Sequence, residues 1–329
     1  MRYSIGPAPH IHDRISTRKI MFDVLIALAP AAILAVFMWG WYMLLIEIGS
    51  MVLAEFLEFV AMRYMRKDKS FTPDGSAAVT GLLLAMNVPA NIPWWMMAIG
   101  VFISIMIAKE VFGGIGNNPF NPALVGRLFM YISFPAAMTT WPKVDWFHFS
   151  QAAFNLQTTA TPLGVIKLNG MAALHKDYPH LMLNAFLGNL PGSAGEMSAL
   201  ALILGFLYLW WKGIVSFEIP VAYIGTTFGL AAIYWFVNPA AYPDPTTAIL
   251  IGGIMLGALF MATDPVTSPV TSGGKWIFGI GCGVITILIR YVGSYPEGVN
   301  FAILLMNALV PFIDQITRPK VFGEVRKNG

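Results

Sequence analysis

Long apolar runs separated by short polar breaks occupy most of the chain from residue 21 to residue 317. A helix needs about 20 residues to cross a bilayer, and shorter broken segments occur in transporters. Gly40 divides the first run, and the third run is a half-length segment that ends at Asn87-Val88-Pro89. The pattern predicts an all-α polytopic membrane protein with segments at 21–39, 41–62, 76–89, 93–113, 121–138, 198–214, 217–236, 246–263, 276–292 and 300–317.

The ten expected segments divide into two related halves. Gly81 to Pro89 and Gly257 to Pro265 have the same spacing, and Lys109 and Arg290 each precede a Gly-containing turn and an Asn. Five is an odd number, so the second half would be inverted relative to the first, as in many transporters. We therefore expect one membrane domain, 1–329, with repeats at 20–138 and 198–317 and a connecting loop at 139–197.

Composition and charge placement fit this prediction. Only 11% of the residues are charged, against roughly 25% in soluble domains. With the N-terminus in the cytoplasm, fifteen of the twenty Lys and Arg residues lie on the inner side, as the positive-inside rule requires. Both termini are then cytoplasmic, and the 139–197 loop is on the outer face. No cleavable signal peptide is expected, because the N-terminus is polar and basic.

Charged residues inside apolar segments are costly and mark functional or paired positions. Glu47, Glu55 and Glu58 lie within about 80° of one another on a helix and should face the bundle interior. Glu58 could pair with Arg63 or Arg66. Arg127 lies inside the fifth run, where we expect a buried acid or a neighbouring subunit as its partner.

The loop contains the stretch Thr158-Thr159-Ala160-Thr161-Pro162-Leu163. Pro162 disfavours a helical conformation for Thr161 and favours an extended one, so its hydroxyl would be accessible to a modifying enzyme. Thr158 is an alternative acceptor without a following proline. The letters alone are equally those of an ordinary polar loop.

Several strings resemble the NqrB/RnfD family, which includes RnfD (RsxD), a membrane component of the Rnf electron-transport complex. They run over nearly the whole chain: Asp74 to Ala85, Ala108 to Ala123 with Asn-Asn-Pro-Phe-Asn-Pro-Ala, Ala160 to Leu163, Thr263 to Pro265, and Tyr295 to Ala302. Many members have Gly where this chain has Thr159.

The resemblance implies FMN bound through its phosphate to Thr161, a second, non-covalent riboflavin in some members, and a urea-transporter-like fold. It implies electron relay between ferredoxin and NAD coupled to Na⁺ or H⁺ transport in the inner membrane. The other Rnf subunits (A, B, C, E and G) and a flavin transferase would be the partners. The chain has no NADH fingerprint, and its one cysteine, Cys282, cannot hold an iron–sulfur cluster.

Two further groups of residues are candidate flavin or ion contacts. Gly192 and Ser193 precede the sixth segment, where Ser193 and Glu196 have capping-box spacing and a helix N-terminus could hold an anion. The second group lies at the broken segments and comprises Asn87, Asn118, Asn121, Thr263 and Asp264. In both cases simple capping of helix ends is the alternative.

No catalytic residue, metal site or nucleic-acid patch is expected. The rival function is a urea-transporter-like channel or secondary transporter without flavin, and a third hypothesis is a structural scaffold subunit. The sequence leaves open the coupling ion, the direction of electron flow and the presence of riboflavin.

Overall fold

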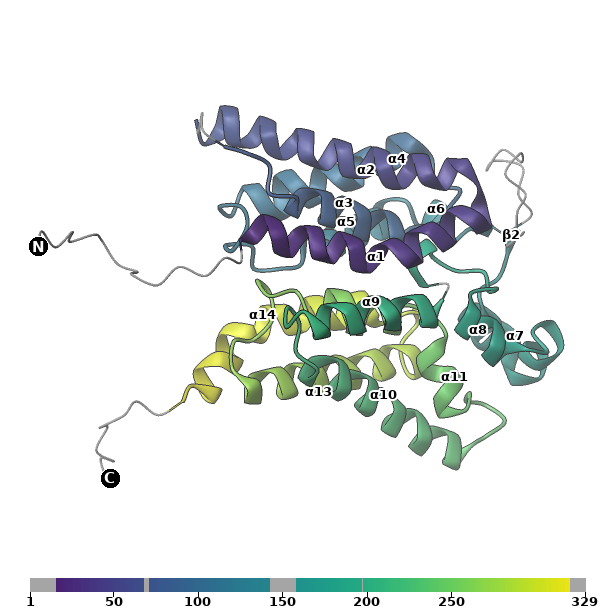
Figure 1. Ribbon diagram of the computed structural model, residues 1–329. Helices are drawn as coiled ribbons and strands as arrows, with labels where there is room; N and C mark the ends of the chain where they lie inside the picture. Colours follow the sequence, from purple (N-terminus) through teal and green to yellow (C-terminus); the bar gives the residue numbers. More distant parts are fainter. Residues whose placement is uncertain (1–15, 68–70, 143–157, 197, 320–329) are drawn as a thin grey trace, which may run out of the picture.

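The computed structural model describes residues 16–67, 71–142, 158–196 and 198–319. These residues are mostly helical and form two groups of helices stacked on one another (Figure 1). Helix α1 begins, and helix α14 ends, at the same end of the bundle, which we call the terminal end. Helices α7 and α8 lie at the opposite end, which we call the loop end.

The first group contains two long helices and three shorter elements around a buried half-length helix. Its elements are α1 (Thr17–Trp39), α2 (Trp41–Val60) continued by η1 (Ala61–Met65), α3 (Ser76–Met86), α4 (Trp94–Phe102) continued by η2 (Ile103–Glu110), α5 (Pro122–Ser133) and α6 (Pro135–Met138). Gly40 separates α1 from α2 with a φ of 77°, a backbone conformation that favours glycine.

The second group has a similar order of elements. They are α9 (Ala199–Trp211), α10 (Glu218–Val237), a broken segment, α13 (Ser272–Tyr291) and α14 (Val299–Thr317). The broken segment consists of α11 (Pro245–Leu250), α12 (Ile254–Leu256) and η5 (Gly257–Met261). Its interruption at 251–253 includes Gly252, whose φ is 72°.

Helix α3 and the broken segment enter the molecule from opposite ends and meet inside it. With 11 residues, α3 is about 16 Å long, half the thickness of the hydrocarbon layer. All of its residues are buried. The amide of Asn87, just beyond α3, lies 3.5 Å from the sulfur of Met261 at the end of η5.

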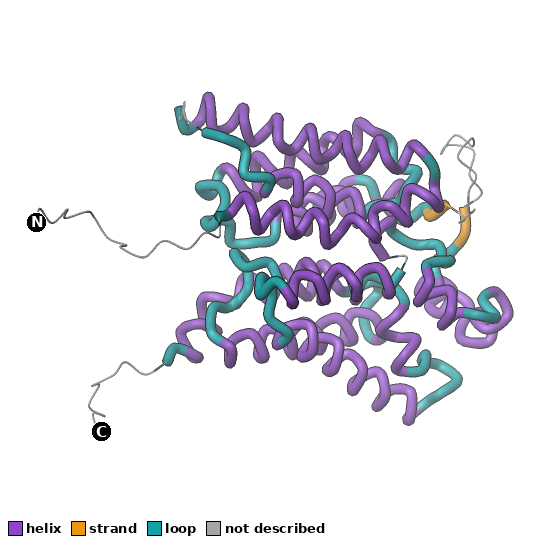
Figure 2. The backbone as a smooth tube through the Cα atoms, in the orientation of Figure 1, coloured by secondary structure: helices purple, strands orange, loops and turns teal. Residues whose placement is uncertain are grey.

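The connecting loop contributes a small cap at the loop end (Figure 2). Strand β1 (Trp141–Pro142) pairs antiparallel with β2 (Thr158–Thr159), and α7 (Pro162–Asp177), α8 (Leu181–Leu187) and η4 (Ala194–Glu196) follow. Residues 143–157 of the expected outer loop lie outside the described residues. Helix α7 has a kink at Gly170, whose φ is 78°.

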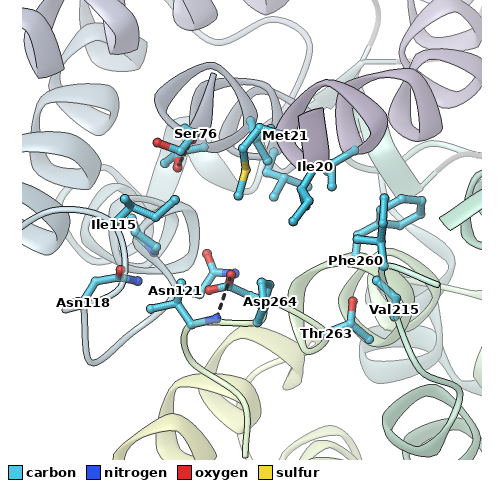
Figure 3. A pocket seen from close by; sticks show the side chains of 18 of the residues that line it. Ile20, Met21, Ser76, Ile115, Asn118, Asn121, Val215, Phe260, Thr263 and Asp264 are labelled. Atoms are coloured by element: carbon cyan, nitrogen blue, oxygen red, sulfur yellow. Dashed lines mark hydrogen bonds between the residues drawn. The ribbon is translucent and has the colours of Figure 1, made fainter. Parts of the chain in front are cut away.

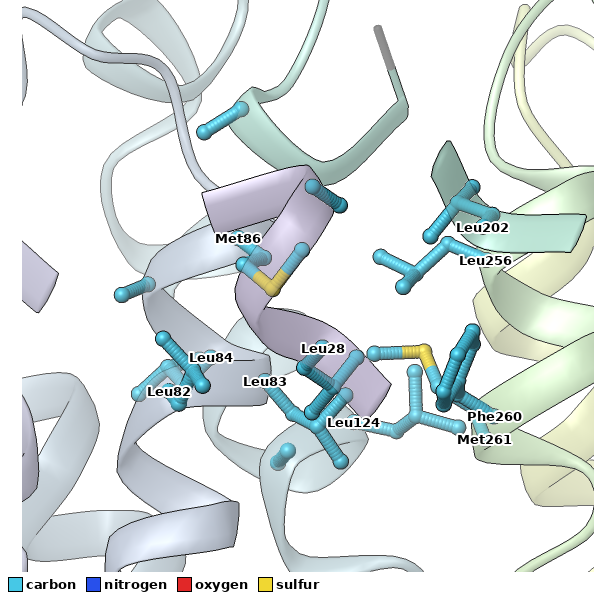
Figure 4. Packing of buried hydrophobic residues seen from close by; sticks show 14 of the residues in the cluster. Leu28, Leu82, Leu83, Leu84, Met86, Leu124, Leu202, Leu256, Phe260 and Met261 are labelled. Atoms are coloured by element: carbon cyan, nitrogen blue, oxygen red, sulfur yellow. The ribbon is translucent and has the colours of Figure 1, made fainter. Parts of the chain in front are cut away.

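Both groups share one apolar core (Figure 4), in which Leu28, Leu83 and Leu124 of the first group lie on the side of Phe260 and Met261 of the second. Helices α1 and α9 approach closely, because a Cβ atom on Gly205 would lie 2.0 Å from the carbonyl oxygen of Ala27. Small residues permit such contacts between membrane helices, which have little hydrophobic drive to associate.

Each segment expected from the sequence contains helix, and the described residues confirm a mostly helical chain. Four helices are long and apolar enough to cross a membrane, namely α1, α10, α13 and α14. Many large apolar side chains on the outer surfaces of these helices and of α2 are exposed, as expected of a surface that faces lipid or neighbouring subunits.

Candidate functional site

Thr161 lies at the loop end, where it forms the N-cap of α7. Its backbone is extended, with φ −66° and ψ 156°, as expected for a residue before proline. Its hydroxyl oxygen accepts a hydrogen bond from the Gly164 N–H at 3.1 Å. The residue is partly exposed, so the hydroxyl both caps the helix and borders open space.

The stretch around Thr161 is fixed by contacts on both sides. The Tyr178 hydroxyl donates to the Ala160 carbonyl at 2.8 Å. Lys167 of α7 donates to the carbonyl oxygens of Gly293 and Tyr295 at 2.7 and 2.6 Å, in the turn before α14. Because these contacts reach the second group of helices, the position of α7 is tied to the bundle.

Two cavities adjoin the Thr161 stretch. The larger, of about 460 Å³, is lined by Thr159, Ala160, Asn169 and Tyr178 among others. The smaller, of about 20 Å³, is bordered by Thr161 and Gly192 and by the carboxyl groups of Glu196 and Glu297. The structure therefore brings Gly192 to Thr161, whereas Ser193 is fully buried and does not line this cavity.

Arg127 organises a buried polar network directly behind the smaller cavity. Its guanidinium lies 2.7 Å from a Glu297 oxygen and 3.6 Å from a Glu196 oxygen. It also donates to the side-chain oxygens of Asn87 and Asn300 at 3.0 and 2.8 Å. The expectation of a buried acidic partner for Arg127 is confirmed, and the network joins α5, the end of α3 and the start of α14.

The two carboxyl groups of this network have different environments. Burial, together with the neighbouring Glu297 carboxylate, raises the pKa of Glu196 to about 8. Burial acts in the same direction on Glu297, but the Arg127 guanidinium and a hydrogen bond from Glu196 outweigh it and lower the pKa of Glu297.

A second site is a mostly apolar cavity toward the terminal end, whose polar lining residues include Asn118, Asn121, Thr263 and Asp264 (Figure 3). Asn121 caps α5 and its amide donates to the Met261 carbonyl at 3.2 Å. Asp264 accepts from the Thr267 hydroxyl at 2.9 Å. Apolar side chains of α1, including Ile20 and Met21, form the facing wall.

The sequence-predicted residues thus fall into two separate sites. Asn118, Asn121, Thr263 and Asp264 share the terminal-end cavity, while Thr161 and Gly192 lie together at the loop end. Asn87, expected with the first set, does not line that cavity but contacts Arg127. Among the described side chains, no group of three or more His, Cys, Asp or Glu residues is arranged to bind a metal.

Two local predictions were wrong for identifiable reasons. Helix α9 is capped by Ser198, which accepts from the Ala201 N–H, because Glu196 turns toward Arg127 instead of completing a capping box with Ser193. Glu58 pairs with Lys109 rather than with Arg63 or Arg66, and Arg66 pairs with Glu110. The face of α2 that carries Glu47 and Glu58 is buried, as expected.

Sequence reasoning missed Glu297 and Asn300 as parts of the site. The available signals were their place in the Tyr295 to Ala302 string of the resemblance and, for Asn300, its place after Arg290 in the comparison of the two halves. Their contacts with Arg127 join residues 170 and 173 positions apart, and periodicity within one segment cannot reveal such contacts.

Comparison with known proteins decides the family. The model of the NQR2, RnfD, RnfE family matches residues 4–323. The chain belongs to this family. It is 43% identical, over 98% of its length, to the D subunit of the proton-translocating ferredoxin:NAD(+) oxidoreductase complex of Clostridium ljungdahlii, covering 97% of that protein. It is 39% identical to the D subunit of the Na(+)-translocating ferredoxin:NAD(+) oxidoreductase complex of Acetobacterium woodii, with 98% and 96% covered.

A third relative within the NQR2, RnfD, RnfE family is the D subunit of the ion-translocating oxidoreductase complex of Salmonella typhimurium. It is 36% identical, and the match covers 98% of this chain and 99% of that protein. Because the matches run nearly end to end, they include both the terminal-end cavity and the Thr161 stretch.

Proposed function

We propose that this chain is the membrane-embedded D subunit of an ion-translocating ferredoxin:NAD oxidoreductase complex. It carries FMN covalently on Thr161 and relays electrons within the complex, and it is not catalytic alone. The observation that carries the proposal is the setting of Thr161. Its hydroxyl lies at a helix N-terminus, the residue lines the smaller cavity, and its neighbours Thr159 and Ala160 line the larger one. The relatives of the chain are named as subunits of such complexes.

The local geometry suits a phosphate on the Thr161 oxygen. The first N–H groups of a helix have no intrahelical acceptor, and the helix dipole favours negative charge there. The Gly164 N–H already donates to the oxygen that would become the phosphoester. Asn169 and Tyr178 line the larger adjoining cavity and would offer polar contacts to the flavin ring. FMN supplies the redox chemistry, whereas the chain anchors and orients it.

The terminal-end cavity is the best place in the described chain for a second, non-covalent flavin such as riboflavin. Asn118, Asn121, Thr263 and Asp264 offer amide, hydroxyl and carboxyl groups at the ends of helices. The cavity measures about 90 Å³, whereas ligand sites measure roughly 300–1,000 Å³. Binding would therefore require the apolar wall formed by Ile20 and Met21 to move outward.

Ten membrane segments in two inverted repeats are part of the proposal. In support, α3 and the broken segment enter from opposite ends, and each half places a basic residue of its fourth helix against its broken element. Lys109 contacts Ser76 at the start of α3, and Arg290 donates to the carbonyl oxygens of Ala248 and Ile251 of the broken segment. The positive-inside rule would then put the terminal end in the cytoplasm and Thr161 outside the inner membrane.

Partner subunits would supply the nucleotide and iron–sulfur sites, and a flavin transferase would attach FMN. Electron flow through the complex would be coupled to Na⁺ or H⁺ transport. The apolar surfaces of α1 and α2 are available for those subunits and for lipid, because residues such as Phe22, Ile48 and Phe56 are exposed.

In-gel fluorescence of the subunit, produced with its flavin-attaching enzyme and run under denaturing conditions, tests the proposal. We expect a fluorescent band that disappears in Thr161→Ala and persists in Thr158→Ala. A dark wild-type band would favour the urea-transporter-like channel. A fluorescent band whose loss in Thr161→Ala leaves turnover of the complex unchanged would favour a scaffold role.

A further inference from the structure

Two carboxyl groups close the floor of the small cavity beside Thr161. Glu196 belongs to η4 and Glu297 to the turn before α14, and both line the cavity together with Thr161. Both carboxyl groups lie against the same nitrogen of Arg127, Nη2, with a Glu196 oxygen at 3.6 Å and a Glu297 oxygen at 2.7 Å. The Glu196 side chain is only 3% exposed, and its Oε1 atom has no hydrogen-bond partner among the described residues.

The backbone around the pair leaves almost no free space. A Cβ atom on Gly253 would lie 2.8 Å from Glu196 Oε1, and one on Gly252 would lie 3.4 Å from Glu297 Oε1. The cavity itself, of about 20 Å³, has room for about one water molecule. Two carboxylates in contact at a dry site repel each other, and one of them keeps a proton in such an arrangement.

The charged and titratable neighbours come from two further helices. Helix α5 contributes Arg127, which contacts both carboxyl groups, and Tyr131, which faces Glu297. Helix α13 contributes Arg290, whose guanidinium faces both carboxyl groups while it donates to the carbonyl oxygens of Ala248 and Ile251. Two guanidinium groups therefore balance two carboxylates once the shared proton has left.

We propose that Glu196 and Glu297 hold one exchangeable proton between them and deliver it, through the cavity beside Thr161, to the group that Thr161 carries. The existence of the shared proton rests on the burial of the two carboxyl groups and on their place together at Arg127 and the small cavity. Its destination rests on the proposed function, because it requires a flavin on Thr161.

Charge and mass balance in this step. An electron from a reduced iron–sulfur donor adds one negative charge to the flavin, and the pair gives up one proton to it, directly or through one water. The flavin then carries no added charge, while the pair changes from one negative charge to two, beside Arg127 and Arg290. When the electron leaves, the proton returns to the pair, so no further oxidant or reductant is consumed.

Infrared difference spectroscopy tests the shared proton without any flavin. In Thr161→Ala protein taken from acid to alkaline pH, we expect a protonated-carboxyl band that disappears as the pH rises. The band should be lost in Thr161→Ala/Glu196→Gln and shifted or lost in Thr161→Ala/Glu297→Gln. It should persist when Glu218→Gln, a change at the other end of the molecule, is introduced instead. A band unaffected by either pair substitution would overturn the proposal.

Redox titration of the flavin-loaded complex tests the destination of the proton. In the wild type, we expect the midpoint potential of the Thr161 flavin to change little with pH over the range in which the pair holds its proton, because the proton moves within the protein and none is taken from solution. In Glu196→Gln and Glu297→Gln the flavin must take its proton from solution, so the potential should fall as pH rises, by the equivalent of about a tenfold change in the equilibrium constant per pH unit, at unchanged flavin content. Equal pH dependence in wild type and both variants would refute the transfer. A protein without covalent flavin would instead refute the proposed function and leave the infrared result standing.

Folding of the variants is checked separately, so that loss of the infrared band or of the redox effect can be assigned to the missing carboxyl group and not to misfolding. Flavin content per chain and elution as a monodisperse peak in detergent report the folded state. If Glu196→Gln fails this check, Glu297→Gln and Glu196→Asp carry both tests, because Asp retains a titratable carboxyl group on a shorter stem. We expect Glu196→Asp to keep a pH-dependent band at a changed frequency, and its absence in a folded protein would count against the pair.

Discussion

At the residue scale, Arg127 is the side chain on which the interior depends most. It contacts Glu196, Glu297, Asn87 and Asn300, and its side chain is 4% exposed. No single one of these contacts would fix the ends of α3 and α14. Together they tie the two groups of helices to one point, next to the proposed flavin site.

Replacing Arg127 with Met should destabilise the protein strongly. Removal of one partner from a buried ion pair leaves the other charge uncompensated, which costs about 3–5 kcal/mol. Thermal unfolding in detergent measures the change. The matched control is Lys212→Met, because the Lys212 side chain is 35% exposed and lies 3.6 Å from Asp23, which keeps a hydrogen bond from the Tyr208 hydroxyl. An exposed pair contributes at most about 1 kcal/mol. Equal effects of the two substitutions would contradict this assignment.

Glu196 should make stability depend on pH. The unfolded chain loses this proton near the ordinary value of 4.5, whereas the folded protein keeps it to about 8. Between these values the unfolded state binds fewer protons, so the free energy of unfolding falls as pH rises and levels off above about 8. Glu297, whose pKa is lowered, acts only at more acidic pH.

The Glu196→Gln variant should lose this slope. Thermal midpoints measured at intervals between about pH 5 and pH 9, a range that brackets the folded-state pKa of Glu196, provide the comparison. Glu218→Gln is the control that keeps the wild-type slope. A wild-type slope that survives in Glu196→Gln would assign the pH dependence to another group.

At the element scale, close backbone contacts hold the two groups together. Helix α9 meets α1 at Gly205, where a Cβ atom would lie 2.0 Å from a backbone oxygen and 3.0 Å from the Phe260 ring. Neither helix can yield without moving its own neighbours, because Ala27 and Leu202 are buried in the shared core.

Gly205→Ala should therefore be destabilising, although alanine is the better helix former. Overpacking costs about 1–3 kcal/mol, which exceeds the gain of about 1 kcal/mol in helix propensity. Gly225→Ala in α10 is the matched control, since no atom lies within 4 Å of its added Cβ, and it should be neutral or stabilising. Thermal unfolding of both variants measures the two effects. A Gly205→Ala variant as stable as the wild type would contradict the close approach of α1 and α9 at Gly205.

The elements also show what the sequence could and could not reveal. Apolar runs and breakers located the helical segments of both groups, because membrane helices are limited by length and by Gly and Pro. They did not predict α7 and α8, which lie in the stretch expected as a connecting loop. Arg127 could be singled out as a charge in an apolar run, and Thr161 through the family resemblance, with the following proline predicting its extended backbone. The interruption at 251–253 was not expected. Gly252 and Gly253 leave space for the side chains of Glu196, Glu297 and Arg290, which a Cβ atom at either position would crowd. Such a reason exists only in the folded molecule.

At the scale of the whole molecule, the proposed topology requires opposite exposure of the two ends. The single cysteine, Cys282, is buried, so a Cys282→Ala background is suitable for labelling. Arg18→Cys, at the start of α1, should react with an impermeant maleimide only in inverted vesicles. Ala240→Cys, between α10 and α11, should react only from the outside of cells. Labelling of both positions from the same side would refute the proposed topology.

The central claim, a flavin held through a phosphoester on Thr161, is tested most directly by mass spectrometry of the peptide containing residues 158–163. The protein should be produced together with its flavin-attaching enzyme. We predict that this peptide carries the mass of FMN less one water, with fragment ions that place it on Thr161. An unmodified Thr161 in such material, in a folded complex that transfers electrons, would contradict the account.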